Sequence, residues 1–326
     1  MVSLKNIFFK LIRKLYRLIY GFDDTKSGLV EYSQMEGNDF IYKSLCNAES
    51  SNRGLMIAKF GTYELNSLVS YLYNYGNSYK LSFCDMLKST CDSLDFSSNL
   101  YHLSLNAGMF PETKAEGIAL CEEYRLALTK IDILSSYQLN ERLIKKYTQC
   151  HFVDLDGFYA PFKYPQPWTR WLKDKKVLIV HPFIDSIKSQ YENNREKLFS
   201  NPLVLPKFKK IEFIKAVQSA AGNKPVEFDT WHEALFSMEK EISQKDFDVA
   251  LIGCGAYGLP LAAYVKSLGK IGIQLAGWTQ MLFGVYGQRW ITQQPEYNKY
   301  INKYWIRPNQ SETPVKSNNI EGGCYW

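Results

Sequence analysis

The stretch DVALIGCGAYGLPLAAYVKSLGKIGIQL, residues 248–275, contains the pattern that decides the fold. Residues 248–253 and 270–275 are short apolar runs of the kind that forms buried strands. Between them, residues 259–267 predict a helix that ends at Gly269. A strand, a crossover helix and a second strand at this spacing form a βαβ unit, which implies that the two strands pair in parallel.

The same alternation of strands and helices extends through most of the chain. Strands are predicted over residues 55–60, 151–155 and 177–181, and helices over residues 63–73, 184–199 and 229–245. The pattern predicts an α/β fold, a Rossmann-like and mostly parallel sheet with helices on both faces. We expect this domain over residues 23–305 and an extended C-terminal tail over residues 306–326.

Composition narrows the class of protein. The chain has 326 residues, 46% of them apolar and 22% charged, which is enough to bury a full core and excludes a disordered chain. The chain has seven cysteines, an odd number, and none of them forms a CxxC pair. It has only four histidines. We therefore expect neither a disulfide framework nor a structural zinc site. We expect a reducing, cytoplasmic environment.

The positive charge is concentrated at the N-terminus. The net charge is +6, and residues 1–20 contain five lysines and arginines and no acid, so the remaining residues supply only +1. No broad basic face is left for nucleic acid, which we do not expect as a partner. Residues 1–22 predict an amphipathic basic helix. It either lies on an anionic membrane, peripheral on the inner face of the cytoplasmic membrane, or packs on the body with its basic face in water.

The glycine-rich turn GCGAYG, residues 253–258, follows one predicted strand and begins a helix. Such a turn offers backbone N–H groups at the positive end of a helix, which suits a phosphate. A dinucleotide is the usual ligand of this motif, but the next strand ends in Gln274, with no acid for a ribose hydroxyl. We therefore expect no NAD. The candidates for diphosphate binding are Gly253, Gly255, Tyr257 and Gly258; alternatively, the glycines only allow tight packing.

A second strand-to-helix junction is KFGTYELN, residues 59–66. Its candidates are Gly61, Thr62 and Glu64. Glu64 falls in the first turn of the predicted helix, where a carboxylate either complements the helix dipole or contacts a ligand at the end of a parallel strand. Both explanations stay open at this level.

Two further groups follow predicted strands. His181 ends the strand VLIVH, and the next helix carries Lys188, Ser189, Gln190 and Arg195. Taken singly, such residues are usually structural or solvated. Together, near other strand ends, they predict a cleft with hydrogen-bond donors for a diphosphate.

The segment after the last predicted strand adds two candidates, Gln280 and Arg289. In this stretch, which ends in Arg289-Trp290, an aromatic ring and a guanidinium could stack on or pair with a base or a sugar. The chain contains no G-x-S-x-G elbow, Walker lysine or H-E-x-x-H motif, which removes the commonest hydrolase, nucleotide-kinase and metalloprotease classes.

From about residue 35 to the end, the chain resembles uncharacterised proteins of bacterial capsule and O-antigen gene clusters. The motifs that carry this resemblance are KFGTYELN, NAGMF, VLIVHPF, SIKSQY, CGAYGLPLAAYVK, FGVYGQRW and EGGCYW. These proteins are distantly similar to GT-D type glycosyltransferases, in which a Phe-Gly pair precedes an Asp-x-Glu motif that handles the metal and the donor diphosphate. Here Phe60-Gly61 is followed by Thr62-Tyr63-Glu64. Glu64 carries over, whereas Thr62 replaces the aspartate, which weakens the attraction for Mn²⁺ or Mg²⁺.

The resemblance implies a glycosyltransferase in surface polysaccharide biosynthesis. It would move a sugar from a nucleotide-diphosphate donor to a lipid-linked or oligosaccharide acceptor, with Glu64 or His181 as the catalytic base. Without the aspartate, Lys188 or Arg195 would supply part of the positive charge that a bound metal ion provides in the GT-D family. Two alternatives remain: an NAD(P)-dependent or other nucleotide-cofactor enzyme, and a non-catalytic, membrane-associated scaffold of polysaccharide assembly.

Overall fold

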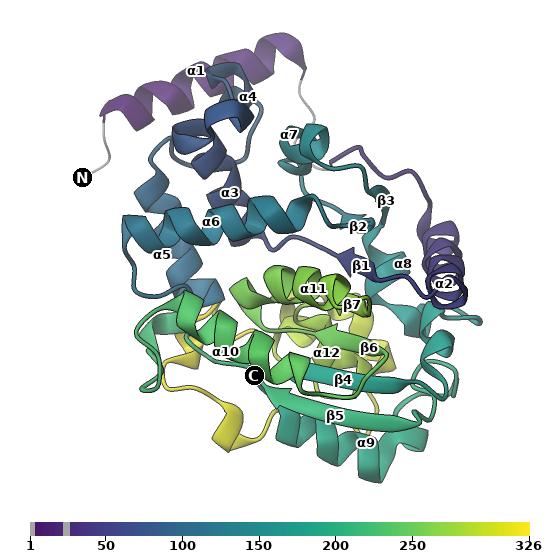
Figure 1. Cartoon of the computed structure of the whole chain (residues 1–326). Coiled ribbons are helices and arrows are strands. Elements are labelled where there is room, and N and C mark those ends of the chain that lie inside the picture. The colour runs from purple at the N-terminus through teal and green to yellow at the C-terminus, as the bar shows by residue number, and fades with distance from the viewer. Residues whose placement is uncertain (1–3, 22–26) are drawn as a thin grey trace.

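The computed structural model describes residues 4–21 and 27–326, and their centre is a seven-stranded sheet (Figure 1). The strands are β1 (Leu55–Ala58), β2 (Ile133–Ser136), β3 (His151–Asp154), β4 (Lys176–His181), β5 (Lys210–Lys215), β6 (Val249–Ile252) and β7 (Ile271–Gln274). Their order is β3-β2-β1-β7-β6-β4-β5, and every neighbouring pair is parallel. The predicted α/β fold with a parallel sheet is confirmed.

Helices cover both faces of this sheet. They are α1 (Leu4–Tyr20), α2 (Gln34–Ser50), α3 (Thr62–Tyr75), α4 (Phe83–Leu87), α5 (Phe96–Ala107), α6 (Lys114–Leu128), α7 (Glu141–Ile144), α8 (Leu155–Tyr159), α9 (Ile184–Leu198), α10 (Trp231–Ser243), α11 (Gly258–Ser267) and α12 (Trp278–Leu282). Short 3-10 turns connect several of them. The predicted helices over residues 63–73, 184–199, 229–245 and 259–267 correspond to α3, α9, α10 and α11.

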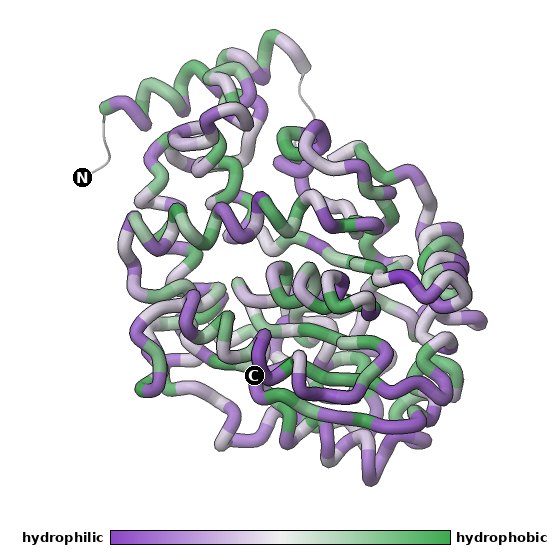
Figure 2. The backbone as a smooth tube through the Cα atoms, in the orientation of Figure 1, coloured by the Kyte–Doolittle hydropathy of each residue, from purple (hydrophilic) through white to green (hydrophobic). Residues whose placement is uncertain are grey.

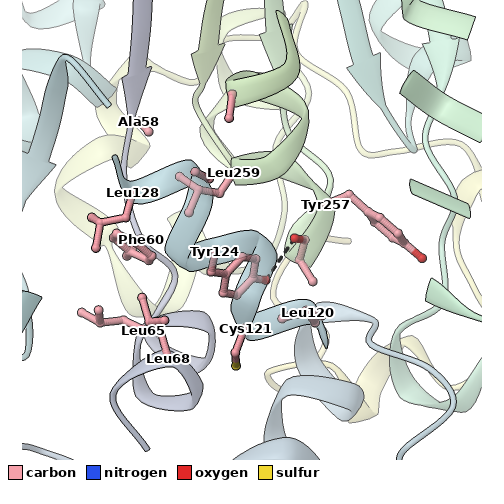
Figure 3. Packing of buried hydrophobic residues seen from close by; sticks show 14 of the residues in the cluster. Ala58, Phe60, Leu65, Leu68, Leu120, Cys121, Tyr124, Leu128, Tyr257 and Leu259 are labelled. Carbon is pink, nitrogen blue, oxygen red and sulfur yellow. Dashed lines mark hydrogen bonds between the residues drawn. The ribbon is translucent and has the colours of Figure 1, made fainter. Parts of the chain in front are cut away.

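Two hydrophobic cores lie on opposite sides of the sheet because successive strand residues point to opposite faces. In β1, Met56 and Ala58 join the core formed with α3, α5, α6, α10 and α11, whereas Leu55 and Ile57 join the core formed with α2, α8, α9 and α12. Figure 2 shows the hydrophobic segments gathered along the strands and the helix faces that meet them. Figure 3 shows part of the first core, where the buried hydroxyl of Tyr124 donates to the carbonyl of Ala256 at 3.0 Å.

The proline- and aromatic-rich segment between β3 and β4 carries the chain across the sheet. Residues 155–175 form α8 and short 3-10 turns, and they take the chain from β3 at one edge of the sheet to β4 near the other. Buried Trp168 anchors this crossing through an indole N–H bond to the carbonyl of Phe158. This segment therefore connects the two halves of the sheet within a single fold.

The two ends of the chain pack on this core in different ways. Helix α1 lies against α4 at the upper edge of the molecule in Figure 1. Residues 306–326 contain two 3-10 turns, Gln310–Glu312 and Ser317–Asn319. Ile320 and Cys324, which follow the second turn, are buried. No helix in residues 4–21 and 27–326 is both long and apolar enough to cross a bilayer. All seven cysteines are free thiols.

Candidate functional site at the carboxyl edge of the sheet

A cavity of about 640 Å³ opens at the carboxyl edge of the parallel sheet. Each of the seven strands contributes at least one wall residue at its end or within a few residues after it; these are Lys59 (β1), Tyr137 (β2), Tyr159 (β3), His181 (β4), Ser219 (β5), Gly253 (β6) and Trp278 (β7). Parallel strands all end at the same edge, so residues far apart along the chain meet there. Eight predicted site residues line this cavity, namely Gly61, Thr62, Glu64, His181, Gly253, Gly255, Gln280 and Arg289.

Lys59 and Glu64 place opposite charges on the same wall. The Glu64 carboxylate lies over Gly61, since a Cβ at Gly61 would be 1.8 Å from Oε2 of Glu64. Burial raises the pKa of Glu64, and the nearby Lys59 ammonium partly opposes that shift. A larger residue at position 61 would therefore displace the Glu64 carboxylate from its present position.

The ammonium of Lys59 is held among aromatic rings. It lies 5.6 Å from the ring centroid of Tyr137 and 5.8 Å from that of Tyr159. Burial by itself lowers the pKa of Lys59, but the oxygens of Tyr137, Tyr159 and Glu64 oppose it and hold the pKa well above its usual value. Lys59 is therefore a fixed positive charge in the cavity wall, with cation–π contacts that keep it in place.

His181 is a hydrogen-bond donor to the cavity and a weak base. Its Nδ1 accepts the backbone N–H of Phe183 at 3.0 Å, so the ring proton of the neutral imidazole is on Nε2. Burial lowers the pKa of His181 to about 3. The ring is neutral at physiological pH, and the prediction that it acts as the catalytic base is not favoured, because so weak a base holds a proton poorly.

The glycine-rich turn after β6 serves both packing and the cavity. A Cβ at Gly253 would lie 2.4 Å from the carbonyl oxygen of Ala276 and 2.8 Å from Cδ2 of His181. Gly255 has φ +55° and touches the backbone of Ala107 on its open side. These two glycines are required for close approach and also line the cavity.

The second half of that turn lies behind the cavity wall, so the structure does not bring Tyr257 and Gly258 to the cavity with the other predicted site residues. The Tyr257 ring stacks on Trp231 with centroids 5.1 Å apart, and its hydroxyl bonds the hydroxyl of Ser219 at 3.1 Å. Gly258 packs against Gln274. Neither Tyr257 nor Gly258 lines the cavity, because the chain turns inward to begin α11.

The four candidates on α9 do not reach the cavity either. Lys188 and Ser189 are exposed, and Gln190 is buried with its amide donating to the carbonyls of Gly284 and Tyr304. Arg195 lies three turns into the helix, beside Glu196 and the carbonyl of Leu205. Helix α9 leaves the end of β4 and runs back along the face of the sheet, so only its beginning is near the site.

Residues after α12 and in the C-terminal tail close one side of the cavity. The Arg289 guanidinium lies over the ring of Tyr325, 4.5 Å from its centroid, and forms an ion pair with Glu321. The Gln280 amide donates to the carbonyl of Tyr325 at 3.1 Å, while its buried Oε1 has no protein partner in the part of the chain that the structure describes. The tail is therefore part of the cavity wall.

The sequence missed the aromatic side chains that surround the charges. Tyr137, Tyr159, Trp278, Tyr325 and Trp326 all line the cavity. Tyr137 and Tyr159 each follow a predicted or actual strand, which is a usable signal, but only the fold shows that the tail reaches the same edge. These rings give the cavity flat, apolar surfaces.

The residues of the cavity do not fit a metal centre built by the protein alone. Within residues 4–21 and 27–326, no group of three or more histidines, cysteines, aspartates or glutamates could hold a cation. The cavity's two carboxylates are Glu64, which faces Lys59, and Glu321, which is paired with Arg289.

Comparison with known proteins gives a single distant similarity to report. No family model and no curated protein matches the chain. Among solved structures, it is similar to a selenomethionine-substituted structure of domain of unknown function 1792 (DUF1792), with 12% sequence identity and a TM-score of 0.43. The match covers 87% of this chain and 93% of that chain. At this distance the likeness carries no functional conclusion. The fold and the cavity define an α/β protein with a polar and aromatic ligand site at the carboxyl edge of its sheet.

Proposed function

We propose that this protein is a glycosyltransferase that moves a sugar from a nucleotide-diphosphate donor to a lipid-linked acceptor in bacterial surface polysaccharide assembly. The observation that carries the proposal is the convergence of Lys59, Arg289 and Glu64 on one aromatic-lined cavity at the carboxyl edge of a parallel sheet. Open α/β sheets bind nucleotides at this edge. The resemblance to capsule and O-antigen cluster proteins supplies the substrate class.

The two cations are suited to the leaving group. When the bond between the anomeric carbon and the diphosphate oxygen breaks, negative charge develops on the diphosphate. Lys59 and Arg289 are fixed in a partly dry wall, where positive charge stabilises such an anion more strongly than in water. The neutral His181 ring adds an Nε2–H donor to the same oxygens.

Glu64 is the group suited to accept the proton. The acceptor hydroxyl attacks the anomeric carbon with its oxygen, and its proton passes to the Glu64 carboxylate as the new glycosidic bond forms. Burial raises the pKa of Glu64 and makes it a stronger base than an exposed glutamate. The phenol and indole rings of Tyr137, Tyr159 and Trp278 provide surfaces for the sugar and the base.

Isothermal titration against UDP-, GDP-, CDP- and dTDP-sugars, with and without Mn²⁺, tests the proposal. We expect one nucleotide class to bind, Lys59→Met to weaken that binding at least about tenfold, and Lys188→Met to leave it unchanged. Lys188 is a matched control because it is an exposed lysine outside the cavity. The absence of binding across the panel, or binding of NADH in its place, would overturn the proposal.

A further inference from the structure

The outward face of helix α1 is apolar, although the helix is joined to the body. Its exposed side chains include Leu4 (85%), Phe8 (65%), Leu11 (57%), Leu15 (59%), Leu18 (81%) and Ile19 (73%). With about 100° of rotation per residue, these six fall within roughly 60° of either side of one line along the helix. We call this set the outer stripe.

The inward face of α1 holds two of its arginines. Arg13 donates to the carbonyls of Ser89 and Cys91, and Arg17 donates to that of Ser89. Phe9 is buried and meets Phe83 of α4 edge to face, and Asn6 exchanges hydrogen bonds with residues 93–94. These directional contacts fix the rotation of the helix. The alternative expected from sequence, a packed helix with its basic face in water, is therefore only half right: the helix packs, but part of the basic face is inside and the outer stripe is in water.

Lysines border the outer stripe. On the same 100° rule, Lys5 lies on one side of it and Lys10 and Lys14 on the other, and all three are exposed. Lys10 lies 3.9 Å from Asp92, and even so half of its side chain remains accessible. An apolar stripe with Lys5 on one side and Lys10 and Lys14 on the other matches a bilayer surface, where hydrocarbon receives the stripe and anionic headgroups meet the ammonium groups.

We propose that the outer stripe of α1 docks the protein on an anionic lipid surface, with α1 lying parallel to the bilayer plane. The charge pattern favours this occupant over a second copy of the chain, because a second copy would bring its own lysines against these. α1 is placed at the edge of the molecule, next to α4, so the body does not obstruct the approach (Figures 1 and 2). The proposal does not depend on what the cavity binds.

Co-sedimentation of the full chain with phosphatidylglycerol–phosphatidylcholine vesicles tests the docking. We expect binding that falls as salt rises and that Leu11→Gln/Leu15→Gln weakens at least about tenfold. Leu126→Gln/Phe236→Gln is the control, since it removes two comparably exposed apolar side chains from α6 and α10 and should leave binding unchanged.

Three outcomes overturn the proposal. These are no binding to anionic vesicles, equal loss in the control variant, and a dimer in solution that dissociates when the outer stripe is changed. Circular dichroism of each variant confirms that α1 substitutions leave the fold intact, because Leu11 and Leu15 make few contacts with the body.

Discussion

Arg289 is paired with Glu321, 32 residues further along the chain, and both side chains line the cavity. The pair joins the segment after α12 to the C-terminal tail, whose Glu321 N–H also bonds the side chain of Asn106. A carboxylate therefore already sits beside a cation that we expect to meet the donor diphosphate. We therefore expect the donor and the tail to compete for the Arg289 guanidinium.

Removing that competitor should strengthen donor binding. We expect Glu321→Gln to lower the dissociation constant of the nucleotide diphosphate about fivefold, which corresponds to roughly 1 kcal/mol for a partly exposed ion pair. Titration calorimetry measures this, with exposed Glu296→Gln as the control. Weaker binding in Glu321→Gln would show instead that Glu321 holds Arg289 in position.

The proton acceptor can be separated from the binding groups. Glu64→Gln should reduce kcat at least about 100-fold, because general-base catalysis contributes on that scale, and should change the donor dissociation constant only a few-fold. Exposed Glu192→Gln on α9 should match the unchanged protein. A Glu64→Gln enzyme with normal kcat would remove this residue from the chemistry.

Stability should depend on pH through His181. The folded pKa of about 3 lies below the ordinary value of 6.5, so the contribution of the neutral ring is fully present above pH 6.5 and is lost as pH falls toward 3. At pH 5 we expect the unchanged protein to have lost about 2 kcal/mol more than His181→Asn, relative to pH 7.5.

Urea unfolding at the two pH values measures this difference. Buried acids such as Glu141 contribute equally to both proteins and cancel. His102→Asn changes an exposed ring and should show no such difference. Equal pH dependence of the unchanged protein and His181→Asn would contradict the assignment.

The packing of the C-terminal tail on the body depends on Gly277. A Cβ at Gly277 would lie 2.5 Å from Cε1 of Tyr325, so Gly277→Ala should displace that ring and destabilise the fold by about 1–3 kcal/mol. In a Tyr325→Ala background the same alanine should cost much less, since its clash partner is gone. Thermal unfolding of the four proteins in this double-mutant cycle gives the coupling. If the effects of Gly277→Ala and Tyr325→Ala on stability are additive, the two residues are not in contact and the tail does not pack on Gly277.

Much of the sheet could be predicted because buried parallel strands are continuous apolar runs. β1, β4, β6 and β7 have this character, and each coincides with a predicted strand. β5 reads KIEFIK, with charges between its apolar residues, because it is an edge strand with half its surface toward water. β2 reads ILSS, and its buried serines conceal it in the sequence.

The candidate site was predictable in part from the ends of the predicted strands. Glu64, His181 and Gly253 lie at or a few residues beyond a strand end and line the cavity. Gln280 and Arg289 also line it, from α12 and the segment that follows this helix. Lys188 and Arg195 lie on α9, which carries them away from the edge. The contribution of Tyr325 depends on a contact between the tail and Gly277 that no local pattern encodes.

Residues near the ends of all seven strands border the cavity. The residues that would determine ligand specificity are therefore largely distinct from those that form the two hydrophobic cores. A substitution in one loop remodels one side of the binding space while the sheet and its two cores keep their packing. We therefore expect exchanges of residues at the rim of the cavity to change which ligand binds while leaving the stability of the fold nearly unchanged.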